Sequence, residues 1–285
     1  MNSFSEGCTE AKIKQNDNMN NSVADCSLAS EGFSSAALKN IACQNYSVMS
    51  SWVKESEATF SEMLESYQNE YVFLNQLFNK IVLGTHSLNT TTAFSQLWVE
   101  NSKADFVVIN GKAVVYEIKT DLDNLSRLEG QLADYYKAFS NVVVVCGEKN
   151  LPSVLRFAEA SSVGVLCMKR KGSFATIKPY IENNDQLDSE AIFRLLRKPE
   201  YTELILSLGE DLPVCKEVDY YQECKAIVSS YPAIEVAGKA MTILKKRDKI
   251  KKEGSYKTIP YSLRASLYFS NLSKKERSRF FDLAV

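Results

Sequence analysis

Three charged residues lie within and beside a pair of apolar segments near the middle of the chain. Asp105 precedes the apolar run FVVI, and Glu117 and Lys119 end the next run, AVVYEIK. Residues two apart on a strand point to the same face, so we expect Glu117 and Lys119 to share one. Burying two charges among apolar neighbours costs several kcal/mol unless the charges are paired or bound to a metal. The pattern therefore predicts a functional site at the end of this strand.

The position of Asp105 depends on the register of the hairpin expected around the Asn-Gly pair at residues 110–111, a strong short-range hairpin signal. A regular two-residue turn would point Asp105 to the wrong face of the sheet. A three-residue loop would instead pair Ile109 with Ala113 and set Asp105 opposite Glu117. We therefore predict an odd loop or a β-bulge in this hairpin.

Apolar periodicity places the elements around this hairpin. Between Glu55 and Leu83 apolar residues recur at spacings of three and four, which predicts one long amphipathic helix ending near Gly84. Asp121 or Asp123 would cap the helix that follows the hairpin, and the run VVVVC after that helix is typical of a buried parallel strand. We expect an α/β fold with strands and helices at 55–83, 90–99, 104–109, 113–119, 123–139, 142–146, 152–160, 163–168 and 174–177.

The two ends of the chain differ from this central part. Residues 1–50 are rich in Asn and Ser, which predicts a polar N-terminal tail with at most a short helix between Phe33 and Tyr46. Residues 51–185 form the expected core, and residues 186–285 read as a helical, basic C-terminal region. Residues 239–285 hold thirteen Lys or Arg against four Asp or Glu, although the net charge of the chain is -1. Such a stretch suits a polyanionic partner or, equally, a solvated helical face.

Composition limits the classes of protein to which the chain can belong. With 285 residues and 45% hydrophobic content it has ample material for a globular core. No apolar run approaches the roughly 18 residues that span a bilayer, so we expect a cytoplasmic protein with no membrane partner. A single histidine, His86, and seven cysteines without a CxxC pair disfavour structural zinc and hydrolytic triads. Glycine-rich phosphate-binding and dinucleotide motifs are absent from the sequence.

The charged residues of the hairpin resemble the signature of the PD-(D/E)xK nuclease superfamily. That signature is an Asp, a short gap and Glu-x-Lys, and it is matched by Asp105 followed by Glu117-Ile118-Lys119, with Ala in place of the Pro. The resemblance covers residues 60–146, where the expected order of elements is that of the restriction-endonuclease-like core. The same segment resembles an uncharacterised group of bacterial and phage-borne members, which suggests a phage or mobile-element setting.

The helix after the motif carries a second element of this resemblance. Gln131 and Tyr135 are four apart and so lie on one helix face, matching the Q-x-x-x-Y element of RecB-type and phage-exonuclease-like branches. Arg127 lies one turn earlier, where a guanidinium could meet phosphate. The resemblance implies that Gln131 orients the site and that Arg127 and Tyr135 bind nucleic acid. Core packing is an equally good expectation for Tyr135.

The resemblance also implies a metal cofactor, Mg²⁺, with Mn²⁺ as a substitute. Asp105, Glu117 and the backbone carbonyl of Ile118 would be ligands. Many members add a glutamate from the first helix, and Glu70 is the best-placed candidate because it lies between apolar positions of that helix. A structural ion pair is the alternative for Glu70, and the competing glutamates are Glu62, Glu65 and Glu100.

The implied activity is metal-dependent hydrolysis of phosphodiester bonds in nucleic acid, in DNA more than in RNA, with Lys119 stabilising negative charge as it develops. The C-terminal basic stretch would then follow a phosphate backbone through Lys245, Lys246, Arg247, Lys249, Lys251 and Lys252. Nearby aromatic residues, which would either stack on bases or pack in the core, are Tyr256, Tyr261, Tyr268 and Phe269.

Two other interpretations remain open. The chain could be a catalytically silent nucleic-acid-binding or regulatory module on the same fold, although such a module has no physical reason to keep Asp105, Glu117 and Lys119 together. A purely structural or interaction protein would bind no metal at all. A homo-oligomer and a partner protein are both compatible with the sequence.

Overall fold

The computed structural model describes residues 31–247 and 256–283, which fall into two compact units. The first unit comprises the described residues up to Asn75 and from Tyr256 onward, and the second comprises Gln76 to Arg247. The described helices after residue 256 belong to the first unit, whereas the helices between Ser189 and Leu244 belong to the same unit as the sheet. The reason is a shared core, in which Ile192 and Leu204 of those helices belong to the same buried cluster as Val115 of the sheet.

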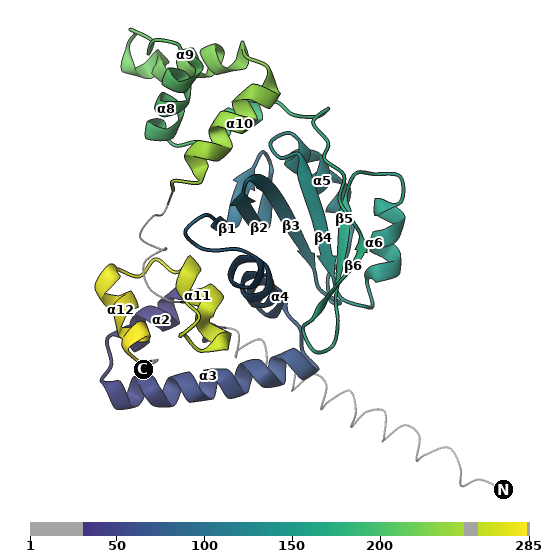
Figure 1. Ribbon diagram of the computed structural model, residues 1–285, viewed down its shortest axis with the longest axis vertical. Coiled ribbons are helices and arrows are strands. Elements are labelled where there is room, and N and C mark those ends of the chain that lie inside the picture. Colours follow the sequence, from purple (N-terminus) through teal and green to yellow (C-terminus); the bar gives the residue numbers. More distant parts are fainter. Residues whose placement is uncertain (1–30, 248–255, 284–285) are drawn as a thin grey trace, which may run out of the picture. The chain divides into compact units, whose positions relative to one another are not determined.

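The second unit is built on one six-stranded mixed sheet, which confirms an α/β fold (Figure 1). The strands follow one another in sequence order across the sheet. The first three pair antiparallel, the third, fourth and fifth pair parallel, and the last pair is antiparallel again. Their bounds are β1 Thr92–Val99, β2 Ser102–Asn110, β3 Lys112–Lys119, β4 Asn141–Cys146, β5 Gly164–Met168 and β6 Phe174–Lys178.

The register between β2 and β3 is the one that the three-residue loop predicts. Ile109 pairs with Ala113, and Gly111 at the tip of the hairpin has a φ of 70°, a conformation that favours glycine. The paired residues continue to Phe106 and Tyr116, beyond which the next position on β2 is Asp105. The predicted odd hairpin loop is therefore confirmed, and it brings Asp105 to the level of Glu117.

Two helices connect the parallel strands, α5 Leu128–Tyr136 and α6 Leu151–Ala158. α5 packs against β2 and β4 and buries Leu128, Leu132 and both of its tyrosines. The expected start of this helix near residue 123, behind an aspartate cap, is wrong. Asp123 instead accepts hydrogen bonds from the backbone N–H and hydroxyl of Thr120, at 2.7 and 2.8 Å, so it closes the turn after β3 and the helix begins later.

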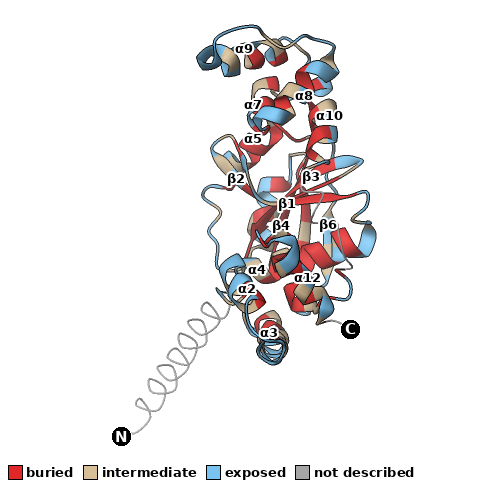
Figure 2. Cartoon of the chain, turned by 90° about the vertical axis from the view of Figure 1, so that its left-hand side faces the viewer, coloured by how far each residue is buried: buried red, intermediate tan, exposed pale blue. Residues whose placement is uncertain are grey.

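The described part of the second unit also contains α7 Ser189–Arg194, α8 Lys198–Leu208, α9 Glu217–Ser229 and α10 Ala233–Leu244. α10 packs against α7 and α8, and α7 packs against α9. Figure 2 shows that the strands and the inward sides of these helices consist mainly of buried residues. The helical pattern expected after residue 188 is thus confirmed within the described residues.

The first unit is helical, with α2 Ser35–Ala42, α3 Tyr46–Ser66, the 3-10 turn η3 Tyr261–Leu263, α11 Arg264–Phe269 and α12 Lys274–Asp282. Leu38 and Met49 are fully buried in it, so packed structure begins earlier than the tail expected over residues 1–50. Tyr256 and Tyr268 are also buried, and their rings meet edge to face. Of the two uses expected for these aromatic residues, the structure shows core packing. No helix in the described part of the chain is long and apolar enough to cross a membrane.

The single helix predicted over residues 55–83 is interrupted. α3 ends at Ser66, α4 spans Glu70–Leu77, and the π-helical segment η1 spans Phe78–Thr85. Tyr67 leaves helical geometry, with φ of -147° and ψ of 83°. The interruption changes which side chains face the core, and Glu70 becomes an exposed residue in the first turn of α4. The expectation that Glu70 lies on an apolar helix face is therefore wrong.

Candidate active site at the end of strand β3

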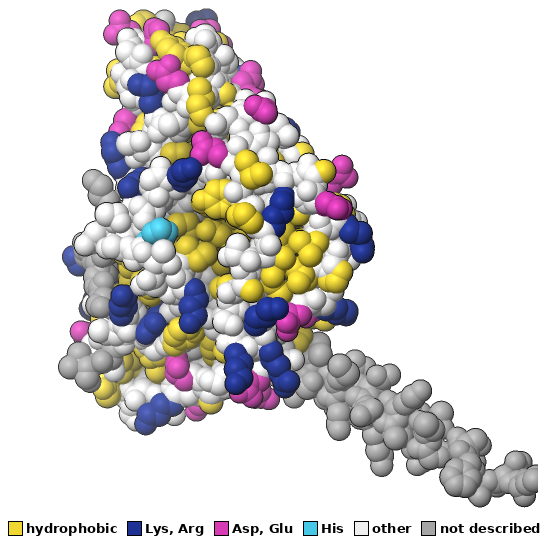
Figure 3. All heavy atoms as spheres, turned by 45° about the vertical axis from the view of Figure 1, so that its right-hand side comes forward, with side chains coloured by type: hydrophobic (Ala, Val, Ile, Leu, Met, Phe, Trp, Pro, Cys, Tyr) yellow, Lys and Arg dark blue, Asp and Glu magenta, His cyan; other side chains and the backbone are white. Residues whose placement is uncertain are grey.

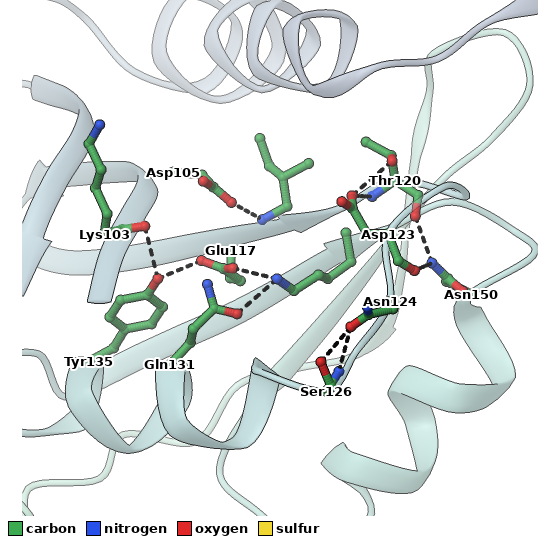
Figure 4. Close-up of polar contacts among 12 residues, drawn as sticks. Lys103, Asp105, Glu117, Thr120, Asp123, Asn124, Ser126, Gln131, Tyr135 and Asn150 are labelled. Carbon is green, nitrogen blue, oxygen red and sulfur yellow. Dashed lines mark hydrogen bonds and ion pairs between the residues drawn. The ribbon is translucent and has the colours of Figure 1, made fainter. Parts of the chain in front are cut away.

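Glu117 and Lys119 form a buried ion pair at the carboxyl end of β3. The Lys119 Nζ donates hydrogen bonds to the Glu117 Oε1 and the Gln131 Oε1, both at 2.8 Å. The side chains of Lys119 and Glu117 are only 8% and 1% exposed. As Figure 4 shows, Gln131 reaches this pair from α5, which covers this face of the sheet. The predicted common face of Glu117 and Lys119 is confirmed, and Gln131 joins them as expected.

Tyr135 fixes the other side of the Glu117 carboxylate. Its hydroxyl lies 2.6 Å from the Glu117 Oε2 and 3.1 Å from the backbone carbonyl oxygen of Lys103. Burial raises the pKa of Tyr135 well above its ordinary value, and the negative charges of Glu117 and Asp105 raise it further. The hydroxyl therefore stays protonated at neutral pH and acts as a hydrogen-bond donor to Glu117.

This position corrects one expectation for Tyr135. Its side chain is fully buried, so it cannot contact nucleic acid directly. Because the hydroxyl holds Glu117, Tyr135 acts as a positioning residue and also belongs to the core cluster of the sheet.

Asp105 lies beside the pair and is held by two donors. Its Oδ2 accepts the backbone N–H of Ile118 at 2.8 Å, and its Oδ1 accepts the side-chain amide of Gln96 at 3.2 Å. The backbone pairing of β2 with β3 ends at this level. The Asp105 carboxylate accepts the Ile118 N–H there in place of a backbone carbonyl. Gln96 was not expected from the sequence, because its role depends on the pairing of β1 with β2 and on its φ of 55° within a strand.

The loop after β3 is tied to the loop after β4. The Asn150 side-chain amide donates to the carbonyls of Thr120 and Asp123, at 2.6 and 3.1 Å. Asp121 accepts the backbone N–H of Lys149 at 3.1 Å, and a Cβ on Gly147 would lie only 2.2 Å from the Asp121 carboxylate. These contacts, several of which appear in Figure 4, hold together the loops at the carboxyl ends of β3 and β4, next to Lys119. In open α/β sheets, ligands bind at the carboxyl ends of the strands, as this site would require.

The charges of the cluster suit a divalent cation. Two carboxylates, Asp105 and Glu117, lie at matching levels of β2 and β3, the Lys119 ammonium pairs with Glu117, and a carboxylate oxygen has two lone pairs with which to accept. Among residues 31–247 and 256–283, however, no group of three or more His, Cys, Asp or Glu is arranged to hold a metal. Mg²⁺ commonly uses one or two carboxylates and keeps several waters, so the donor set fits that ion. Glu70 belongs to the first unit, and its predicted role as a metal ligand stays a prediction.

Arg127 caps the start of α5, one turn before Gln131, and is exposed. Its guanidinium makes no hydrogen bond or ion pair with another residue in the described part of the chain. The contact of this guanidinium with phosphate stays a prediction. Figure 3 shows Lys and Arg side chains scattered over one face of the molecule, with Asp and Glu among them, and the single histidine on the surface.

The basic residues after α10 are arranged differently. Arg247 forms an ion pair with Glu200, through an Nε–Oε1 contact of 2.6 Å and a second contact from Nη2, and its side chain is 7% exposed. Lys246 pairs with Glu203, whereas Lys245 lines a hollow of about 370 Å³ at the opposite end of β3. Arg247 is thus paired and mostly shielded from water, in contrast to the free charge expected there, whereas phosphate binding by Lys245 and by the exposed Lys246 stays a prediction. Lys249, Lys251 and Lys252 lie outside the described residues.

Comparison with known proteins gives the chain a family. Residues 63–259 match the family model described as Bacteriophage P4 protein cII. The chain belongs to this family. A curated relative, Protein cII of Enterobacteria phage P4, is 25% identical over 174 residues, which cover 60% of this chain and 62% of the relative. The chain thus spans less than two thirds of that relative's length. No solved structure matches.

The cII family match contains the whole candidate site. All of the sheet lies within residues 63–259, together with Asp105, Glu117, Lys119 and Gln131. The names of the family and of the phage P4 protein state no activity.

Proposed function

We propose that this member of the P4 cII family is a metal-dependent nuclease that hydrolyses phosphodiester bonds, in DNA more than in RNA. The observation that carries the proposal is the buried Lys119 ammonium, which is held by Glu117 and Gln131 beside the second carboxylate, Asp105. A ligand pair alone suits simple metal binding, whereas a positioned lysine next to it suits chemistry on a charged substrate.

The order of the elements supports the proposal. A helical segment, the antiparallel strands β1 to β3, α5 and the parallel strand β4 follow one another, with Asp105 and Glu117 at matching levels of β2 and β3. This is the arrangement that the resemblance to the PD-(D/E)xK superfamily implies. We therefore propose a restriction-endonuclease-like core for the second unit.

In this proposal, Asp105, Glu117 and the carbonyl of Ile118 would hold Mg²⁺, which would neutralise phosphate charge and activate a water molecule when bound. Lys119 would stabilise the negative charge that develops on the phosphate oxygens, and Gln131 keeps its ammonium in place. Tyr135 keeps the Glu117 carboxylate in a single orientation. The exposed guanidinium of Arg127 would hold a phosphate of the strand near the site.

The burial of Glu117 supports a second candidate function. This carboxylate is 1% exposed, and both of its oxygens already have protein partners. Such enclosure favours a catalytically silent nucleic-acid-binding or regulatory module, in which the ion pair only maintains the fold.

Cleavage assays with matched variants distinguish the two functions. Linear, circular and single-stranded DNA and RNA are incubated with purified protein in Mg²⁺, Mn²⁺ or EDTA. We expect metal-dependent cutting that Lys119→Ala lowers by about 10²–10³-fold. Lys112→Ala is the control, because Lys112 lies at the other end of β3 and pairs with Glu182 at the surface.

The carboxylate is tested in the same way. Glu117→Gln should abolish cutting, whereas Glu182→Gln should leave it unchanged, because Glu182 belongs to the surface ion pair with Lys112. Binding of nucleic acid without any cutting, under all metal conditions, would reject the nuclease and support the silent module.

A further inference from the structure

The edge strand β1 carries an exposed tryptophan close to the candidate site. The Trp98 side chain is 63% exposed, and the Lys103 ammonium lies 5.8 Å from the centre of its ring. Trp98 and Lys103 are direct cross-strand partners of β1 and β2. Lys103 is also exposed, so the pair presents an aromatic face and a positive charge together at the surface.

This pair adjoins the site through both strands. On β2, Lys103 lies two residues before Asp105, about 7 Å along the strand. Its backbone carbonyl is a partner of the Tyr135 hydroxyl, and its side chain points away from α5 in Figure 4. On β1, Gln96 lies two residues before Trp98 and donates to Asp105. The Trp98–Lys103 pair and the Gln96–Asp105 pair are therefore neighbours on the same two-stranded ribbon.

An aromatic ring beside a cation is the arrangement that binds unpaired nucleic acid bases. A base stacks on the ring whatever its sequence, and the neighbouring ammonium attracts the phosphate backbone. In a fully paired duplex the faces of the internal bases are stacked on one another and are not available to Trp98. The exposed Arg127 adds a further positive charge at the start of α5.

We propose that Trp98 and Lys103 form a binding site for an unpaired nucleotide next to Asp105, so that the substrate is a single strand or contains unpaired bases. The proposal rests on the proposed function for the reaction itself, but binding can be measured without cleavage. The sequence leaves the substrate class open, and a site of this kind would select nucleic acid with unpaired bases.

The chain contains two tryptophans, Trp52 and Trp98, which allows a direct test. The Trp52→Phe variant of the full chain retains Trp98 as its single tryptophan. Its fluorescence is titrated in EDTA with an oligodeoxythymidine and with a blunt, fully paired duplex. We expect the single strand to quench the emission and raised salt to weaken the binding, whereas the duplex should quench little. The Trp98→Phe variant, which retains Trp52, should show no quenching.

Affinity measured by anisotropy of a labelled single strand gives a second readout. Trp98→Ala should weaken binding about 5- to 150-fold, whereas Trp98→Phe, which keeps an aromatic ring, should retain most of it. Leu206→Ala is the control, because Leu206 is also exposed but lies on α8. Binding of the single strand without quenching, equal binding of the duplex, or no binding at all would overturn the proposal.

These outcomes are independent of catalysis. If Lys119→Ala and the parent protein both fail to cut but Trp98 is still quenched, the nucleotide site stands and the nuclease proposal fails. If cutting is observed and quenching is not, the nuclease proposal stands and the site at Trp98 is rejected.

Discussion

The ion pairs Arg247–Glu200 and Lys119–Glu117 are both shielded from water in the second unit, yet their remaining hydrogen bonds reach different parts of the molecule. Arg247 also donates to the carbonyl of Leu195 at 3.0 Å, and Glu200 accepts the backbone N–H of Arg197 at 2.8 Å. That pair therefore ties the segment after α10 to the start of α8.

Lys119 and Glu117 instead lie two residues apart on one strand, so their contact joins no distant elements. Their other partners, Gln131 and Tyr135, are side chains of α5 that hold the charges at defined positions, with Asp105 nearby. The difference indicates that the first pair stabilises the fold, whereas the second maintains an arrangement of charges at the expense of stability.

The largest effect is expected at Arg247. Arg247→Ala leaves the partly buried Glu200 carboxylate without its charged partner, which should lower the free energy of unfolding by about 3 kcal/mol, the low end for a buried ion pair. Urea unfolding followed by circular dichroism measures the change. Lys246→Ala breaks the neighbouring exposed pair with Glu203 and should cost less than about 1 kcal/mol. Equal losses in the two variants would contradict the structural role of Arg247.

Neutralising both members of each pair sharpens the comparison. Glu117→Gln combined with Lys119→Met should leave the free energy of unfolding unchanged or raise it by about 1–4 kcal/mol, because two buried charges are removed together. Glu200→Gln combined with Arg247→Met should lower it, because the backbone groups of Leu195 and Arg197 lose charged partners. The interpretation fails if the strand pair proves the more costly one to replace.

The two adjacent tyrosines of α5 offer the next test. Tyr135→Phe removes a hydrogen bond to a charged group and should lower the free energy of unfolding by about 1.5–3 kcal/mol. Tyr136 is also buried, but its hydroxyl has no hydrogen-bond partner among the described residues. Tyr136→Phe should therefore be neutral or stabilising. In the cleavage assay, Tyr135→Phe should lower kcat with little change in KM, and an unchanged kcat would remove Tyr135 from the proposed site.

The central part of the fold followed from local signals in the sequence. The strands are marked by β-branched and aromatic residues, and the Asn-Gly tip with the alternation of side chains is enough to predict the pairing of Ile109 with Ala113. The same alternation places Glu117 and Lys119 on one face, and the four-residue spacing places Gln131 and Tyr135 toward them. These relations depend on neighbours that are close in sequence or on regular geometry.

The errors arose where a residue's partner lies far away or where regular geometry ends. Glu200 is 47 residues from Arg247, so the basic stretch gives no local sign that its charge is neutralised. The apolar periodicity predicts the wrong helix face for Glu70, because the break at Tyr67 changes the helical phase without a Gly or Pro to mark it. The sequence predicts Asp121 or Asp123 as a helix cap, whereas the short side chain of Asp123 closes the turn at Thr120.

Gln96 gives the smallest and most specific test of the contrast between stability and function. Its φ of 55° is strained for any residue but glycine, and its amide holds Asp105. Gln96→Gly relieves that strain and Gln96→Ala retains it, so the glycine variant should be more stable in urea by about 1 kcal/mol. Both variants lose the amide, and both should lower cleavage to the same extent. If activity followed stability instead, with the glycine variant the more active, the contact to Asp105 would have no role in the site. If the two variants cleave equally, and both more slowly than the parent protein, while their stabilities differ, the role of Gln96 is to position the Asp105 carboxylate.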